Sequence, residues 1–153
     1  KIGFDKLLDK YNINFSITQA GGGFDDLWLH TSSFQSIMLN LIGNSINTLQ
    51  SVSRKEKWIK VEIEKKFGHL QISVSDNGYG ILQDNWKRIF DHHWTTKKLG
   101  TGMGLTIVRE IIEDDYGGTI KVEKSISEEV ESGAGTTTFL ISIPLQNLTK
   151  EAE

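Results

Sequence analysis

An alternating apolar run that leads into an acidic, glycine-rich motif constrains this chain more than any other feature. Residues 70–74 alternate between apolar and polar side chains, and residues 76–80 follow as Asp-Asn-Gly-Tyr-Gly. Such alternation is typical of a β-strand with one buried face. A second alternating run at residues 59–63, with a turn at residues 67–69 between the two runs, predicts a β-hairpin. The carboxylate of Asp76 is therefore expected at the end of a half-buried strand.

The remaining patterns predict helices and strands that alternate along the chain. Apolar residues at helical spacing indicate two helices, and Gly117 and Gly118 stop the second one. This order indicates an α+β fold: a two-layer α/β sandwich with a mixed, mostly antiparallel sheet and helices on one face. We expect helices at residues 34–49 and 105–112, a helical turn at 86–90, and further strands at 14–18, 27–29, 119–123 and 138–143.

The composition is that of an ordinary soluble domain. The 153 residues, 37% hydrophobic and 24% charged, are expected to form a single domain with its core at about residues 12–145. A net charge of −3 gives no electrostatic reason to expect nucleic acid or an anionic membrane as a partner. The chain has no cysteine and no apolar run long enough to span a membrane. It begins at Lys1, so we expect a cytoplasmic fragment of a longer protein whose other parts could carry a membrane anchor.

The residue types around Asp76 suit the recognition of a purine base. An ionised carboxylate only accepts hydrogen bonds, so it can take one from the exocyclic amine of adenine and discriminate against guanine. Gly78 and Gly80 can adopt positive φ and leave room for a base to lie against the backbone. Taken alone, Asp-Asn-Gly is explained more simply by a hairpin turn.

Two asparagines predict a polar patch on the first long helix. Asn40 and Asn44 are four residues apart and therefore lie on one helical face, although asparagine is unfavourable inside helices. A hard cation such as Mg²⁺ accepts an amide oxygen readily, and nucleotide phosphates and water complete its coordination. The alternative to a metal site is a structural role, in which one amide forms a cap or a hydrogen-bonded bridge within the fold.

A third polar segment predicts a phosphate site at the start of the second helix. Thr95, Thr96 and Lys97 come shortly before the alternate glycines of residues 100–104. Backbone N–H groups and the helix dipole favour an anion at such a place, and Lys97 can add a cation. A dinucleotide-binding fingerprint does not fit, because its third glycine would fall at Leu105 and no buried strand precedes the glycines.

Taken in order, these segments resemble the catalytic ATP-binding domain of sensor histidine kinases, within the Bergerat-fold superfamily of gyrase, heat-shock chaperone, histidine kinase and mismatch-repair ATPases. Each motif is common by itself, and their order over about residues 30–144 makes the resemblance specific. The similar segments are residues 40–45 (asparagine motif), 76–81 (first glycine motif), 89–91 with 95–97 (phenylalanine motif), 100–105 (second glycine motif) and 133–137 (last glycine motif).

The resemblance implies that the domain binds ATP with Mg²⁺. It implies that Asp76 holds the adenine amine, that Asn44 ligates Mg²⁺, and that Asn40 is a second polar contact near the metal, which makes both asparagines catalytic residues. Thr136 or Thr137 completes the adenine pocket. The nucleotide-binding residues that it implies are Asn44, Asp76, Gly78, Gly80, Ile81, Thr95, Thr96, Lys97, Gly100, Thr101, Gly102, Met103, Gly104, Leu105, Thr136 and Thr137.

One position favours a kinase over an ATPase. ATP-hydrolysing members of the superfamily carry a glutamate one turn before the metal-binding asparagine, where it can act on water as a general base. Asn40 occupies that place here and cannot take a proton. The resemblance therefore implies transfer of the γ-phosphoryl group of ATP to a histidine, as a phosphorelay step in two-component signal transduction.

The phosphoacceptor is expected outside this chain. None of His30, His69, His92 and His93 lies in a predicted helical hairpin before an acidic residue, as the family's acceptor does. The partners implied are a dimerisation and phosphoacceptor domain, on the same or a partner chain, and indirectly a response regulator. Because His92 and His93 are adjacent and the chain has no cysteine, we expect no zinc site.

Two residues keep other functions open. Many relatives carry a basic residue and then an aromatic one where this chain has Asn47 and Thr48. That difference removes a cation for the phosphates. One alternative is therefore a degenerate module that senses ATP or ADP without catalysis. An ATPase of the same superfamily and a serine kinase of the same fold are the others.

Overall fold

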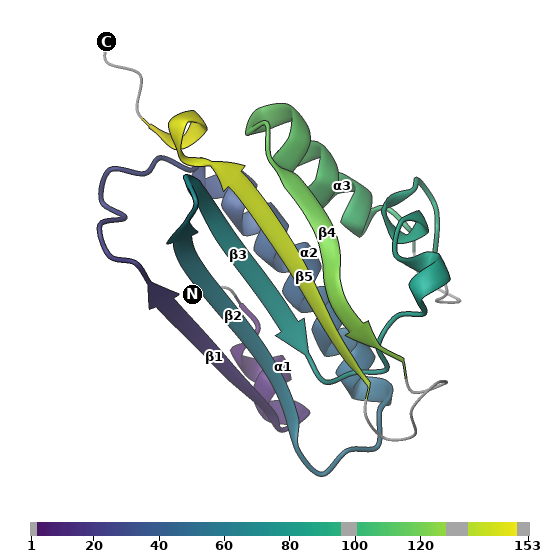
Figure 1. Ribbon diagram of the computed structural model, residues 1–153. Helices are drawn as coiled ribbons and strands as arrows, with labels where there is room; N and C mark the ends of the chain where they lie inside the picture. Colours follow the sequence, from purple (N-terminus) through teal and green to yellow (C-terminus); the bar gives the residue numbers. More distant parts are fainter. Residues whose placement is uncertain (1–2, 96–100, 128–134, 150–153) are drawn as a thin grey trace.

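One long helix packed across a five-stranded sheet forms the centre of the computed structural model, which describes residues 3–95, 101–127 and 135–149. The strands lie in the order β1-β2-β3-β5-β4, with β1 parallel to β2 and the other neighbours antiparallel. Figure 1 shows α2 and α3 on the same side of the sheet. The elements are α1 (Asp5–Lys10), β1 (Ile13–Ala20), α2 (Thr31–Ser51), β2 (Lys57–Lys66), β3 (His69–Asp76), η1 (Gln83–Asn85), η2 (Arg88–Phe90), α3 (Gly104–Glu110), η3 (Ile111–Asp115), β4 (Thr119–Ile126), β5 (Thr136–Pro144) and η4 (Leu145–Leu148).

The predicted hairpin and fold class are confirmed. β2 and β3 pair along their length, and Asp76 is the last residue of β3. Phe67 and Gly68, between the two strands, have φ values of 52° and 76°. Positive φ at both central residues is the geometry of a tight two-residue hairpin turn. The strand that carries Asp76 is thus fixed by a regular hairpin.

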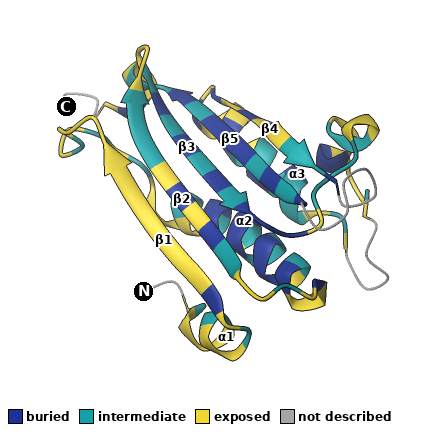
Figure 2. Ribbon diagram, turned by 60° about the horizontal axis from the view of Figure 1, so that its bottom comes forward, coloured by how far each residue is buried: buried dark blue, intermediate teal, exposed yellow. Residues whose placement is uncertain are grey.

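The apolar stripe of α2 fills the space between the helices and the sheet. Ile37 and Leu41 of this helix are almost fully buried, as are Ile59 and Ile72 on the facing strands. Burial of aliphatic side chains of this size contributes about 1.5–3 kcal/mol each. Figure 2 shows the buried side of α2 turned toward the sheet, whereas β1 at the sheet edge is largely exposed. α2 is therefore a firmly packed support for the polar side chains that it carries.

Three segments differ from the prediction. α1 is not predicted, although Phe4, Leu8 and Tyr11 have helical spacing and pack against the core, because its six residues are too few for a sustained periodic pattern. Residues 27–29 form no strand, since Leu27 makes a single bridge with Thr149 instead of joining the sheet. The second helix continues beyond α3 as a π-helical turn, Ile111–Asp115. Within the described residues, no helix combines the length and the apolarity that crossing a membrane requires.

β4 contains a shift in its register with β5. Val122 pairs with Phe139, and Lys124 pairs with Thr138. The intervening residue, Glu123, is one extra residue on β4, which makes this place a β-bulge. Beyond a bulge, the side chains that face the helices change from one set of alternate residues to the other.

Candidate nucleotide site

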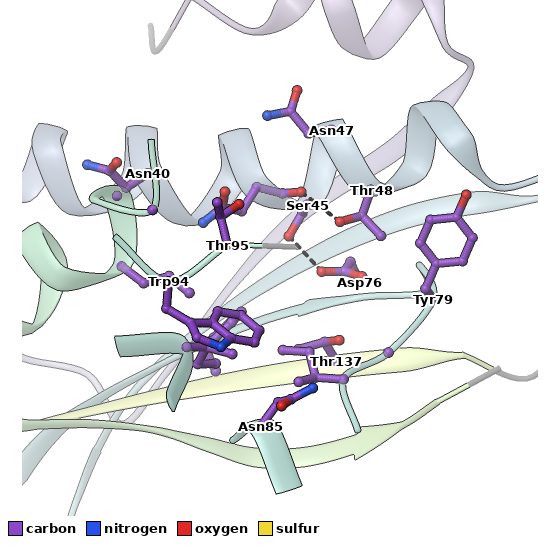
Figure 3. A pocket seen from close by; sticks show the side chains of 18 of the residues that line it. Asn40, Ser45, Asn47, Thr48, Asp76, Tyr79, Asn85, Trp94, Thr95 and Thr137 are labelled. Carbon is purple, nitrogen blue, oxygen red and sulfur yellow. Dashed lines mark hydrogen bonds between the residues drawn. The ribbon is translucent and has the colours of Figure 1, made fainter. Parts of the chain in front are cut away.

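A cavity of about 1080 Å³ lies between α2, the end of β3, the segment before α3 and the start of β5. Asn44 lines it from α2 and Asp76 lines it from β3, so the two groups on which the prediction depends share one space. Figure 3 shows Ser45 of α2 pointing toward Asp76. The predicted residues that line the cavity are Asn40, Asn44, Asp76, Gly80, Ile81, Thr95, Thr101, Gly102, Gly104, Leu105 and Thr137.

Three predicted residues lie beside the cavity rather than on its wall. Gly78 is packed so closely that a Cβ there would press into the side chain of Thr48. Met103 is 42% exposed. The carbonyl of Thr136 accepts a hydrogen bond from β4. The predicted residues Thr96, Lys97 and Gly100 lie outside the described residues.

Asp76 is buried and accepts a hydrogen bond on each of its carboxylate oxygens. The hydroxyl of Ser45 donates to Oδ2 at 2.7 Å, and the N–H of Gly78 donates to Oδ1 at 2.9 Å. A carboxylate that receives donors on both oxygens is itself an acceptor toward a molecule in the cavity. Ser45 is not among the predicted site residues, because it falls within the apolar stripe of the helix. A hydroxyl in that stripe is the signal that could have identified it.

Two other side chains hold the loop after β3 in place. The amide of Asn77 accepts from the N–H of Trp58 at 2.8 Å and donates to a second backbone group of the same segment, so this side chain supports the start of β2. The guanidinium of Arg54 donates to the carbonyls of Gly78 at 3.3 Å and Gly135 at 3.4 Å. Arg54 therefore joins the first glycine motif to the last one.

Thr137 faces the cavity, and Thr136 does not. Thr137 is 5% exposed and stands opposite Asp76 in the pairing of β5 with β3. Successive side chains of a strand point to opposite faces of the sheet. Of the two threonines that the sequence leaves open, only Thr137 lines the cavity.

The asparagines of α2 line the other end of the cavity. Asn40 donates through Nδ2 to the carbonyl of Ser36 at 2.8 Å, so half of its amide is used within the helix. Its Oδ1 would stand 2.7 Å from a Cβ at Gly104, which shows how closely α3 approaches α2. Asn44 lies one turn further along the helix and also lines the cavity. Amide oxygens are ligands that suit Mg²⁺, so this donor set fits such an ion.

The walls of the cavity carry little charge. Among the described residues that line it, Asp76 is the only one with a formal charge. Asn47 and Thr48, for which the resemblance led us to expect a basic and an aromatic residue, both line the cavity. None of the described residues on the wall has a basic side chain that could offset the charge of a phosphate.

Apolar side chains that the sequence did not identify complete the cavity. Trp94 lines it together with Ile89 and Phe139, and Figure 3 shows the indole of Trp94 pointing into the space. A flat apolar surface of this kind suits the face of a purine base. Trp94 lies in a segment without periodic pattern, so the direction of its side chain could not be predicted.

Most of the chain matches one family of known proteins. The family described as histidine kinase-, DNA gyrase B-, and HSP90-like ATPase matches residues 30–147. The chain belongs to this family. One relative is the C4-dicarboxylate transport sensor protein DctB of Rhizobium meliloti, 35% identical over 109 residues, which are 71% of this chain and 16% of that protein. Another is the sensor histidine kinase ZraS of Escherichia coli (strain K12), 35% identical over 115 residues, which are 75% of this chain and 22% of that protein.

Solved structures of histidine kinases share the fold of this family member. The catalytic domain of histidine kinase ThkA matches with a TM-score of 0.72 at 28% identity, over 93% of this chain and 85% of that one. A complex of ThkA with the response regulator protein TrrA matches with a TM-score of 0.70 at 26% identity, over 94% of this chain and 37% of that one. The family and the fold predicted from the sequence are confirmed. The chain spans only 16% to 22% of the length of these curated relatives.

Proposed function

We propose that this chain is the catalytic ATP-binding domain of a two-component sensor histidine kinase. It binds Mg·ATP and presents the γ-phosphoryl group to a histidine on a dimerisation and phosphoacceptor domain of the same or a partner chain. One observation carries the proposal: Asp76, at the end of a buried strand, and Asn44, on the long helix, line one cavity large enough for a nucleotide. Membership of the family supports it.

In this proposal the base end of the cavity selects adenine. Asp76 accepts a hydrogen bond from the exocyclic amine, and Thr137 stands beside it on the neighbouring strand. Trp94 and the other apolar walls remove the base from water. Gly80, with a φ of 76°, lets the loop after β3 turn closely beneath the base.

The other end of the cavity holds the phosphates. Gly102 and Gly104 bring the backbone before α3 close to them. Asn44 would hold Mg²⁺ together with phosphate oxygens and water, and the ion would supply positive charge against the transferred group. The chain then works by positioning: an imidazole nitrogen of the acceptor attacks the γ-phosphorus, the bond to the β–γ bridging oxygen breaks, and ADP leaves.

The described part of the cavity lacks a base that could activate water. Asp76 is the one carboxylate on its described wall, and Ser45 and Gly78 hold it at the base end. Asn40, one turn before Asn44, has an amide that cannot accept a proton. We therefore expect little ATP hydrolysis by the chain alone, and this distinguishes the kinase from an ATPase of the same family.

Phosphorylation of a histidine tests the proposal. The parent protein is incubated with Mg²⁺ and ATP labelled in the γ-phosphate. We expect an acid-labile, base-stable phosphoprotein, and we expect it to form about tenfold more slowly in the Asp76→Asn variant when ATP is below the dissociation constant. An acid-stable product would indicate a serine kinase instead. The absence of any phosphoprotein would refute the kinase proposal.

A module that senses ATP or ADP without catalysis is the second candidate. Asn47 and Thr48 favour it, because no basic side chain lines the described part of the cavity. Calorimetry separates the two functions. A sensing module binds nucleotide equally well with and without Mg²⁺, whereas the kinase depends on the ion.

The wider setting of the domain is also a proposal. We place a single domain, with its core at about residues 12–145, in the cytoplasm, whether or not its parent protein is anchored in a membrane. A response regulator is the expected downstream partner, as in the solved complex of ThkA with TrrA. Because the chain spans about a fifth of its relatives, we expect the sensing and phosphoacceptor parts on other segments.

A further inference from the structure

A row of three side chains crosses the sheet beside the base end of the cavity. Asp76 of β3 stands opposite Thr137 of β5, which in turn stands opposite Ser125 of β4. We propose that Ser125 is a positioning residue: its hydroxyl makes Thr137 a hydrogen-bond acceptor, so the site favours a purine with an amine at position six over one with a carbonyl there. This inference rests on the proposed nucleotide-binding function.

The β-bulge of β4 brings Ser125 to this place. Val122 is buried, and regular alternation would put Lys124 on the same face, opposite Thr137. The extra residue Glu123 shifts the register, so Ser125 takes that position and Lys124 is exposed. Bulges beside binding sites commonly redirect a side chain in this way.

The protons available at Ser125 fix the direction of its hydrogen bonds. A hydroxyl has one proton to donate and two lone pairs. The Ser125 oxygen lies 2.7 Å from the carbonyl oxygen of Thr136, which can only accept, so the proton is used there. The same oxygen accepts from the N–H of Ile81 at 2.6 Å. It lies 3.3 Å from the hydroxyl of Thr137, and in this contact Thr137 must be the donor.

The base end of the cavity therefore presents lone pairs. Thr137 uses its proton on Ser125 and can only accept from a molecule in the cavity. Asp76 already accepts from Ser45 and Gly78 and is an acceptor as well. An exocyclic amine has two protons and matches this wall, whereas a carbonyl oxygen would face other acceptors. Without Ser125, the hydroxyl of Thr137 could turn and donate to that carbonyl.

Ser125 also anchors the loop that lines the cavity. Both backbone groups of Ile81 are held, the N–H by Ser125 and the carbonyl by the indole N–H of Trp86 at 3.0 Å. A Cβ at Gly80 would collide with the carbonyl of Ile126, so this loop lies directly on the end of β4. Loss of the Ser125 hydroxyl should therefore weaken ATP binding in addition to reducing the discrimination between bases.

The test compares ATP with inosine triphosphate, which carries a carbonyl in place of the amine. Calorimetry gives the dissociation constants of the two Mg²⁺ complexes for the full 153-residue chain and for Ser125→Ala. We expect the preference for ATP, expressed as the ratio of the two constants, to fall about fivefold in the variant. Ser75→Ala is the matched control: its hydroxyl lies 2.9 Å from that of Thr138, on the opposite face of the sheet, and its loss should leave the ratio unchanged.

Two further variants separate orientation from packing. Ser125→Thr keeps the hydroxyl and should restore the preference for ATP. Thr137→Val removes the hydroxyl that Ser125 orients, so it should lower the preference by itself, and adding Ser125→Ala should change it no further. If Ser125→Ala binds ATP and keeps the native ratio, the inference is overturned. If the native chain binds neither nucleotide, the proposed function fails instead.

Discussion

The two ends of the cavity are built from different parts of the fold. At the base end, Ser45, Asp76 and Thr137 are 2%, 4% and 5% exposed and belong to α2, β3 and β5. At the phosphate end, Asn40 and Asn44 also belong to α2, but Thr95 and Thr101 are exposed and lie between regular elements. In our proposal, base recognition thus depends on side chains fixed by packing, whereas phosphate binding depends on exposed backbone and on a metal ion held by Asn44. Each end should therefore respond to its own perturbation.

The largest effect is expected from Asp76→Asn at the base end. The change replaces an acceptor-only group by one that is half donor, at a buried contact worth about 1.5–3 kcal/mol. Affinity for ATP should fall about tenfold or more, and adenosine should lose as much because the change does not touch the phosphates. Calorimetry measures both, with Asp84→Asn, an exposed carboxylate in η1, as the control. Unchanged dissociation constants would exclude the assigned base contact.

A comparable change at the phosphate end is Gly104→Ala. The new Cβ would stand 2.7 Å from Oδ1 of Asn40, so Asn40 or the start of α3 must move. Overpacking of this kind costs about 1–3 kcal/mol, and phosphoryl transfer by the parent protein should fall about tenfold. Adenosine binding should persist. Gly43→Ala is the matched control, because a Cβ there meets no atom within 4 Å apart from its chain neighbours and the backbone of its own helix. Loss of adenosine binding in Gly104→Ala would show that the two ends are not separable.

Removal of Mg²⁺ tests, without a mutation, whether the base end and the phosphate end of the cavity bind independently. Asp76 is the only formally charged residue on the described wall, so ATP receives little compensation for its phosphate charge from that wall. We expect chelation with EDTA to weaken ATP binding several-fold and to leave adenosine binding unchanged. Equal affinity for ATP with and without the ion would favour the sensing module over the kinase.

The smallest of these effects is expected from Ser45→Ala. This hydroxyl donates to Oδ2 of Asp76 at 2.7 Å and orients the carboxylate. Its loss should cost about 1 kcal/mol, or roughly fivefold in affinity for ATP. Ser32→Ala, at an exposed position of α2, serves as the control in the same titration. A loss larger than that of Asp76→Asn would mean that Ser45 contacts the nucleotide itself.

The base end could be predicted only in part. The alternating run before Asp76 fixes both a strand and its end, so the acid could be placed from local pattern alone. The role of Ser45 could not be predicted in this way, because it depends on how α2 packs over the strand that carries Asp76, 31 residues later in the chain. Ser125 was hidden by the bulge at Glu123, since regular alternation gives the wrong face beyond that residue.

The phosphate end was less accessible to sequence reasoning. Helical spacing predicts that Asn40 and Asn44 share one face of the helix, and both line the cavity. At the base end, Trp94 also escaped prediction, because an irregular segment has no periodicity from which a direction could be inferred. Thr96 and Lys97 lie outside the described residues, so their proposed contacts with phosphate stay predictions.

The tight turn between β2 and β3 provides an attachment point far from the nucleotide. Phe67 is 86% exposed and adjoins the end of β3 that is opposite to Asp76, at a separation of roughly 23 Å along the strand. Since the chain has no cysteine, Phe67→Cys would supply a unique thiol for a fluorophore or spin label. Distances from such a probe to a labelled phosphoacceptor domain could then follow how the two parts approach during turnover.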